Sequence, residues 1–202
     1  LGAVSRGERP VATGFDPHVD LNFRDIFRTS STRGVVTVIE GCNEFCTFCI
    51  VPYTRGREVS RPIGNVIREV RSLAERGVRE VELLGQTINA YRCPETGAGL
   101  ARLLEAAAGI DGLLRVRFIT SHPRHFSQDL IDVMARHGRV FRYLHLPIQS
   151  GSDAILKKMH RRYTRAQYLE LVDRIRDAVP EINLSTDIIV GFPGETDGDF
   201  AD

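Results

Sequence analysis

The chain has 202 residues, 42% of them hydrophobic and 26% charged, which fits a folded protein and excludes the disordered and fibrous classes. Its 27 lysine and arginine residues nearly balance 26 aspartate and glutamate residues, so the surface as a whole is not basic. No apolar run approaches the roughly 18 residues of a membrane span, and Leu1 to Arg9 has no apolar core typical of a signal peptide.

The first part of the chain, residues 1–33, shows no sustained hydrophobic period, and we interpret it as a linker. From Gly34 to the end, short apolar segments rich in β-branched residues alternate with amphipathic ones. We expect strands over 35–39, 78–84, 114–120, 140–146 and 182–190, each buried on both faces. Because the chain lacks a starting methionine, we expect it to be a piece of a longer protein.

Helical patterns fill the intervals between these strands. Val66, Val70 and Leu73 share one helical face, and similar patterns recur near 100–107 and 130–134. Thr164 and Gln167 form a capping-box sequence that predicts the start of another helix. Strict alternation of strands and helices predicts an α/β fold with right-handed βαβ units and a parallel sheet, either open or closing into a barrel.

The loops that follow the expected strands are polar and rich in glycine or proline. They cover residues 40–42, 85–89, 121–123, 147–151 and 191–195. Since the carboxyl ends of parallel strands meet at one edge, these five loops should line a single mouth where ligands bind.

Three of the four cysteines fall within eight positions, in the first of these loops. Cys42, Cys46 and Cys49 form a C-x3-C-x2-C run, a spacing that indicates metal chemistry in a reducing cytoplasm. Three thiolates suit a 4Fe-4S cluster, which normally takes four, so that one iron remains free for a substrate or cofactor. We interpret Cys93, far along the chain beside Pro94, as an ordinary loop cysteine.

The loop with its aromatic residue before the third cysteine resembles the radical S-adenosylmethionine (radical SAM) superfamily. The resemblance implies that the three thiolates hold a 4Fe-4S cluster whose free iron chelates SAM. Electron transfer then cleaves SAM to methionine and a 5'-deoxyadenosyl radical. It also implies a partial (β/α)6 barrel similar to a TIM barrel, with five of the six strands in this chain and truncation after the fifth strand.

Further segments resemble the methylthiotransferases, and within them the MiaB branch of tRNA 2-methylthioadenosine synthases. They are residues 40–62, 83–91, 120–123, 146–152 and 187–196, and the resemblance covers 34–202. Thr87-Ile88 departs from the Asn-Val more common in the branch but keeps its polar–apolar order. The implied reaction adds a 2-methylthio group to N6-isopentenyladenosine next to the anticodon of tRNA.

Other readings remain open. Related methylthiotransferases act on threonylcarbamoyladenosine in tRNA or on an aspartate of a ribosomal protein. An alternative of another class is a zinc-stabilised RNA-binding module, for which Cys93, His122 or His125 would complete the four ligands of a structural zinc site. Colour distinguishes the two alternatives, because a protein with an iron–sulfur cluster would be brown and a zinc protein would be colourless.

The resemblance also implies roles for polar residues at the strand ends. Gln86 should lie near the methionyl group of SAM, and Ser121 and Gln149 suit its ribose hydroxyls or carboxylate. Arg162 could clamp the carboxylate, although it could equally be a solvated surface residue. Phe48 could face adenine or pack within the loop, and Asp187 could touch adenosine or face the core.

For tRNA, the residues beside the cysteine loop are the candidates. Tyr53, Arg55 and Arg57, with Arg61, could follow phosphates or simply be solvated, and Asn89 and Tyr91 could face the substrate base. We expect His145 to be a satisfied interior histidine and not a base.

The resemblance places further parts of the reaction outside this sequence. They are an N-terminal domain with three cysteines for a second 4Fe-4S cluster that delivers sulfur, and a C-terminal TRAM domain for RNA. The near-neutral charge agrees with RNA binding that lies largely elsewhere. The expected partners are tRNA and an electron donor such as flavodoxin or ferredoxin, and we expect a cytoplasmic monomer with no membrane partner.

Overall fold

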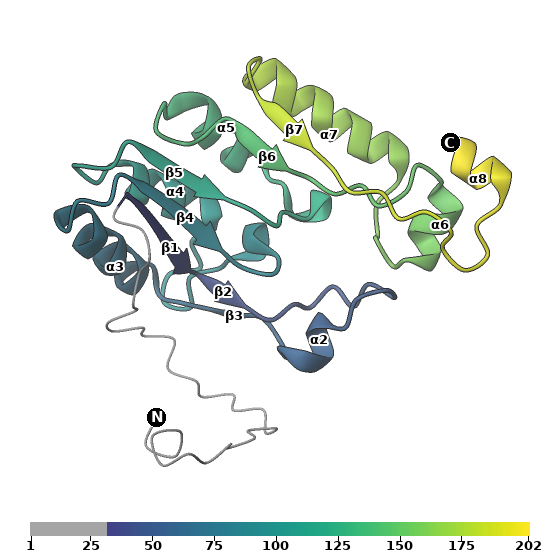
Figure 1. Ribbon diagram of the computed structural model, residues 1–202, viewed down its shortest axis with the longest axis horizontal. Helices are drawn as coiled ribbons and strands as arrows, with labels where there is room; N and C mark the ends of the chain where they lie inside the picture. The colour runs from purple at the N-terminus through teal and green to yellow at the C-terminus, as the bar shows by residue number, and fades with distance from the viewer. Residues whose placement is uncertain (1–31) are drawn as a thin grey trace, which may run out of the picture.

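Five parallel strands follow one another in chain order across the computed structural model, which describes residues 32–202 (Figure 1). Strands β1 (Arg33–Thr37), β4 (Glu80–Leu84) and β5 (Arg115–Phe118) form one sheet. Strands β6 (Tyr143–His145) and β7 (Asn183–Ser185) form a second parallel pair, which a bridge between Val116 and Val140 joins to β5. Nearly all of the segment expected to be a linker, 1–33, lies outside the described residues.

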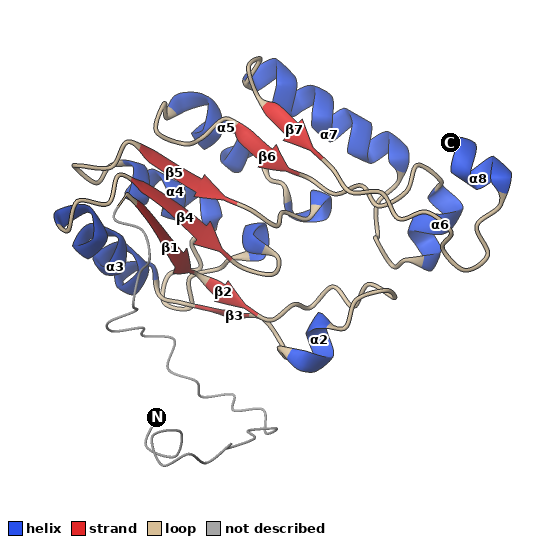
Figure 2. Cartoon of the chain, in the orientation of Figure 1, coloured by secondary structure: helices blue, strands red, loops and turns tan. Residues whose placement is uncertain are grey.

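Helices lie between the strands along the chain, as the alternation predicts (Figure 2). They are α3 (Ile63–Glu75), α4 (Leu100–Ala108), α5 (Gln128–Arg136), α6 (Asp153–Lys158), α7 (Arg165–Ala178) and α8 (Asp197–Ala201). The capping box predicted at Thr164 and Gln167 is confirmed at the start of α7. None of the helices within residues 32–202 is both long and apolar enough to cross a membrane.

Shorter elements surround the first strand and were not expected. Strand β2 (Ile39–Glu40) pairs antiparallel with β3 (Val59–Ser60), and α2 (Val51–Thr54) lies between them. Two 3-10 turns, η1 (Ile88–Ala90) and η2 (Pro123–His125), follow β4 and β5. The segment between β2 and β3 contains the three clustered cysteines, so this antiparallel pair fixes both ends of the cysteine-containing segment.

One face of the sheet is apolar and buried. Val36, Val81, Val116 and Leu144 on this face are no more than 1% exposed, and they belong to the same core as the apolar sides of α3, α4, α5 and α7. Burying each such side chain contributes roughly 1.5–3 kcal/mol, so this layer supplies much of the driving force for folding.

The opposite face carries charges, so the prediction that the strands are apolar on both faces is wrong. Glu80 accepts hydrogen bonds from Arg115 at 2.9 Å and Arg117 at 3.3 Å, and Arg33 pairs with Glu82. The guanidinium groups of Arg115 and Arg117 also lie 4.4 and 4.8 Å from the centre of the Phe141 ring. Alternate residues of a strand point to opposite faces, and only one face packs against helices.

The strand expected over 182–190 ends at Ser185, and its neighbour β6 ends at His145. Leu146 N still donates to the carbonyl of Ser185 at 2.8 Å, beyond which the regular ladder stops. Pairing resumes only at the single bridge between Gln149 and Ile188. The irregular segments beyond these two strands lie at the expected mouth.

Replacing Gly41 by alanine should destabilise the fold. Gly41 has a φ of +75°, and an added Cβ would lie 2.1 Å from the carbonyl oxygen of Arg57. Strain of this kind costs about 1–3 kcal/mol, measurable by urea unfolding. Gly64→Ala in α3 is the matched control, because its Cβ would meet nothing within 4 Å, and it should be neutral or slightly stabilising. Equal stability of the two variants would contradict this account.

Candidate functional site

The cysteine loop, residues 41–50, is tied to several other segments by backbone groups. Gly41 N donates to Gln86 Oε1 at 2.7 Å, and Cys42 N donates to the carbonyl of Gly56 at 3.1 Å. Thr47 N donates to the carbonyl of Met159, at the end of α6, at 3.2 Å. The loop is therefore held from both sides at the carboxyl ends of the strands.

The three thiols of this loop are free, and polar groups lie beside the sulfurs of Cys42 and Cys46. Thr87 Oγ1 lies 3.1 Å from Cys42 Sγ, and Arg161 Nη1 donates to Cys46 Sγ at 3.5 Å. Burial raises the pKa of the Cys42 thiol, and the Thr87 contact acts against that rise. Hydrogen bonds to sulfur are typical of cysteines that ligate iron, so this donor set fits a cluster.

Arg161 donates to a sulfur of the cysteine loop, and sequence reasoning missed it in favour of its neighbour Arg162. Its side chain is buried, donating to the carbonyl of Pro147 at 3.0 Å and to Tyr163 Oη at 2.9 Å as well as to Cys46. Burial raises the pKa of Tyr163 to about 12, so its hydroxyl stays protonated. Arg162 is exposed. Two adjacent arginines in one turn gave no signal as to which would turn inward.

Glu44 connects the cysteine loop to the loop after β5. It accepts a 2.6 Å hydrogen bond from His125 Nε2, which holds the pKa of the carboxyl at about 2. Its second oxygen lies 3.8 Å from His122 Nε2 and 3.5 Å from Arg124 Nη1. Burial lowers the pKa of His122 to about 3, so this imidazole is neutral.

The ligand atoms of Glu44, His122 and His125 lie within 4.8 Å of one another, as a metal site would require. However, His122 Nδ1 accepts a hydrogen bond from Arg124 N at 3.3 Å, which leaves the proton of the neutral ring on the nitrogen facing Glu44. Glu44 Oε2 and His122 Nε2 are buried without a hydrogen-bond partner among residues 32–202, but the Arg124 guanidinium lies 3.5 Å from Glu44 Oε2 and places a fixed positive charge beside this carboxylate, which disfavours a metal cation there.

Backbone strain gathers in the loops around the cysteines. Phe45, Thr120, Gln149, His160 and Arg162 are the non-glycine residues with positive φ within 32–202. One lies in the cysteine loop, two follow β5 and β6, and two follow α6. Strain of this kind persists where the surroundings enforce it, and it clusters at functional sites.

The residues predicted to contact SAM differ in their surroundings. Gln86 is half-buried and bonded to Gly41, while Ser121 is buried with no partner for its hydroxyl among residues 32–202. Gln149 is half-buried in a strained conformation, and Phe48 is 40% exposed. Asp187 is exposed and lies 3.2 Å from His145 Nε2, whose other nitrogen bonds Ser185, so His145 is satisfied as expected.

The tRNA candidates divide into exposed and buried residues. Tyr53, Arg55 and Arg57 are exposed, and Arg57 lies 5.1 Å from the centre of the Phe45 ring. Tyr91 is fully buried, with its hydroxyl donating to the carbonyl of Arg61, so the prediction that it faces a substrate base is wrong. Asn89 is also buried, as its amide exchanges hydrogen bonds with the backbone of His122, and that prediction fails for the same reason.

Two further residues are in the core. Arg61, proposed beside Arg55 and Arg57, is buried and pairs with Glu69 at 2.8 Å. Cys93 is 1% exposed and accepts a 3.5 Å hydrogen bond from Ile63 N at the start of α3. This position separates Cys93 from the other three cysteines and removes it as the fourth zinc ligand of the alternative reading.

Five parallel strands with a three-thiol loop at their carboxyl ends define an α/β protein with a candidate metal centre at the mouth of the sheet. The model of the radical SAM superfamily matches residues 36–202. The chain therefore belongs to this superfamily, which uses a 4Fe-4S cluster and SAM.

Sequence relatives carry one shared name. The chain is 52% identical, over 99% of its length, to a tRNA-2-methylthio-N(6)-dimethylallyladenosine synthase of Jannaschia sp. (strain CCS1), covering 44% of that protein. It is 58% identical over 82% of its length to the enzyme of the same name from Acidithiobacillus ferrooxidans (strain ATCC 53993 / BNL-5-31), covering 38%. The chain thus spans less than half the length of the curated relatives that it matches.

Solved structures agree on the fold. The cobalamin-dependent SAM radical enzyme OxsB matches with a TM-score of 0.62 and 12% identity, covering 77% of this chain and 23% of that one. The radical SAM methyltransferase TsrM from Kitasatospora setae matches with a TM-score of 0.56 and 21% identity, over 77% and 28%. At these identities the likeness concerns the fold alone.

Arg161→Ala should destabilise the protein by about 2–3 kcal/mol, because it leaves the Pro147 carbonyl without its charged donor and empties a buried site. Urea unfolding measures the effect. Arg71→Ala, at an exposed position of α3, is the control and should change stability by no more than about 0.5 kcal/mol. If both variants unfold at the same urea concentration, Arg161 does not hold the loops together.

Proposed function

We propose that the protein is a transferase that adds a 2-methylthio group to N6-isopentenyladenosine next to the anticodon of tRNA. The observation that carries the proposal is the loop of three free thiols, two of them with polar groups within hydrogen-bond distance of sulfur, at the mouth of a radical SAM fold. The shared name of relatives 52% and 58% identical to the chain supports the choice of substrate.

In this proposal Cys42, Cys46 and Cys49 would hold a single 4Fe-4S cluster with one iron left for SAM. Once bound and reduced, such a cluster would supply the electron for reductive cleavage of SAM. Arg161 adds a fixed positive charge beside Cys46, while Gln86 holds the start of the loop through Gly41.

We assign SAM contacts to the polar groups at the neighbouring strand ends. Ser121 is buried with an unpartnered hydroxyl, which a bound ligand would satisfy. Gln149 and Asp187 lie on the paired segments after β6 and β7 and suit ribose hydroxyls. Phe48 offers an exposed ring to adenine. The SAM-carboxylate role of Arg162 stays a prediction.

Substrate RNA would approach over the exposed side of the cysteine loop, where Tyr53, Arg55 and Arg57 can contact phosphates and bases. A flavodoxin or ferredoxin would supply electrons to a monomer in the cytoplasm. Threonylcarbamoyladenosine in tRNA and an aspartate of a ribosomal protein are the competing substrates, and the shared name of the relatives favours isopentenyladenosine.

Alanine replacement of Cys42, Cys46 or Cys49 should abolish the visible absorption of the anaerobically reconstituted cluster. Each thiolate is one of only three protein ligands in this proposal. Cys93→Ala is the matched control and should keep the absorption, since Cys93 is buried away from the loop. A colourless Cys93 variant with intact fold would overturn the three-ligand assignment.

With SAM and a strong reductant, the reconstituted protein should release 5'-deoxyadenosine. In a separate measurement, the Ser121→Ala variant should bind SAM roughly tenfold more weakly than the wild-type protein. This estimate corresponds to about 1–1.5 kcal/mol for one hydrogen bond. Mass spectrometry detects the nucleoside, and calorimetry gives the affinity. This chain alone should not add the methylthio group to tRNA, because the resemblance places the sulfur-delivering cluster outside this sequence. Together with those further domains, it should modify tRNA carrying isopentenyladenosine and not tRNA carrying threonylcarbamoyladenosine. The reverse preference would contradict the proposed substrate.

A further inference from the structure

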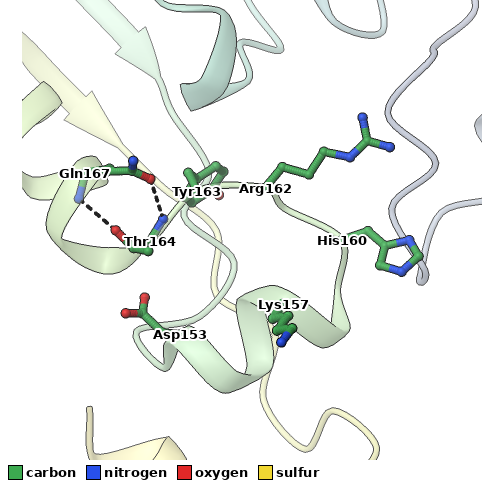
Figure 3. Close-up of a pocket in the computed structure, with 7 residues that line it drawn as sticks. All are labelled: Asp153, Lys157, His160, Arg162, Tyr163, Thr164 and Gln167. Carbon is green, nitrogen blue, oxygen red and sulfur yellow. Dashed lines mark hydrogen bonds between the residues drawn. The ribbon is translucent and has the colours of Figure 1, made fainter.

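A hollow of about 630 Å³ opens where α6 meets α7, and Arg162 is the one residue of its lining that is also predicted to contact SAM (Figure 3). Its lining consists of Asp153, Lys157, His160, Arg162, Tyr163, Thr164 and Gln167. Most of these residues come from the end of α6, the connecting turn and the start of α7, so the hollow belongs to one short stretch of chain.

The groups that remain free in this hollow are cationic or hydrogen-bond donors. Lys157, His160 and Arg162 are exposed, and their side chains have no ion pair or hydrogen bond with any residue that the structure describes. By contrast, Asp153 accepts a 2.7 Å hydrogen bond from Arg165 N at the start of α7. The hollow is therefore suited to an anion.

The first amides of α7 do not provide this anion site, since the helix caps itself. Thr164 Oγ1 accepts from Gln167 N at 3.2 Å, and Gln167 Oε1 accepts from Thr164 N at 2.9 Å, as the dashed lines in Figure 3 show. Any anion in the hollow must be bound by side chains.

His160 has a backbone conformation that usually selects glycine, which indicates that the imidazole side chain at this position has a function. His160 N donates to the carbonyl of Lys157 and Arg161 N donates to that of Leu156, which together close a Schellman motif at the end of α6. Its left-handed position is usually glycine, but here it is His160, with a φ of 58°. Arg162 repeats the same φ of 58° two residues later.

The hollow adjoins the cysteine loop and continues away from it. Thr47, between the second and third cysteines, bonds the carbonyls of Lys158 and Met159 beside the hollow, at 3.0 and 3.2 Å. On the other side a second hollow of about 270 Å³ shares Arg162, Tyr163 and Gln167 with the first, and Arg124 and Arg174 also line it. The two hollows adjoin at these shared residues, and Glu170 lines the second one beside its arginines.

We propose that this α6–α7 hollow binds the phosphates of RNA nucleotides next to the modified base, through Lys157, His160 and Arg162. An RNA strand carries phosphates at regular intervals, which the exposed cations of this hollow can contact. The inference rests on the proposed function, because it takes the substrate to be tRNA.

The test measures affinity for an anticodon stem–loop RNA carrying isopentenyladenosine, with the cluster-loaded protein, over a range of salt concentrations. Lys157→Ala and Arg162→Gly should each weaken binding about fivefold at 0.1 M salt and lower the salt slope by about 0.7, the value for one single-strand phosphate. His160→Gly should weaken binding as well. Because glycine suits a φ of 58°, neither glycine variant should lose stability.

Arg71→Ala, which removes an exposed cation from α3, is the matched control and should leave affinity unchanged. If wild-type protein cleaves SAM but does not bind this RNA, the proposed function fails. If it binds RNA and the hollow variants behave like Arg71→Ala, only the hollow is excluded. A loss of SAM affinity in Arg162→Gly with RNA affinity unchanged would overturn the inference and return Arg162 to the SAM carboxylate.

Discussion

The structure of the site depends on satisfying one buried cation. The guanidinium of Arg161 cannot lose its proton, so its burial requires hydrogen-bond acceptors on several sides. Those acceptors are Cys46 Sγ, the carbonyl of Pro147 and the hydroxyl of Tyr163. They come from the cysteine loop, the loop after β6 and the start of the turn into α7, and satisfying Arg161 therefore fixes these three segments relative to one another.

A second constraint acts on the other side of the cysteine loop, where Glu44 is held by His125 and approached by Arg124. The loop is thus held by a buried cation, Arg161, and through its own buried carboxylate, Glu44, and the partners of the two come from different strand ends. Among the groups of residues 32–202 left unsatisfied is the hydroxyl of Ser121, in the loop after β5. Tight anchoring of a loop next to unsatisfied polar groups is the arrangement expected of a preorganised binding site.

Much of the fold follows from local sequence patterns. The order of strands and helices, the capping box at Thr164 and the cysteine loop could be predicted because each depends on nearby residues. The choice between Arg161 and Arg162, and the burial of Asn89 and Tyr91, could not, because each is decided by acceptors contributed from distant segments. The charged face of the sheet could not be predicted either, because its charged residues form ion pairs with residues of other strands. Those partners are distant in the sequence.

That charged face restricts how the sequence can change. Glu80 lies beside Arg33, Arg115 and Arg117, and Glu82 pairs with Arg33, so two carboxylates serve three guanidinium groups. Removing Glu80 alone would leave like charges facing one another, whereas removing it together with an arginine would not. The effects of substitutions at these positions on stability are therefore expected to be strongly non-additive. A glutamate of this network should be replaced only together with one of its arginine partners.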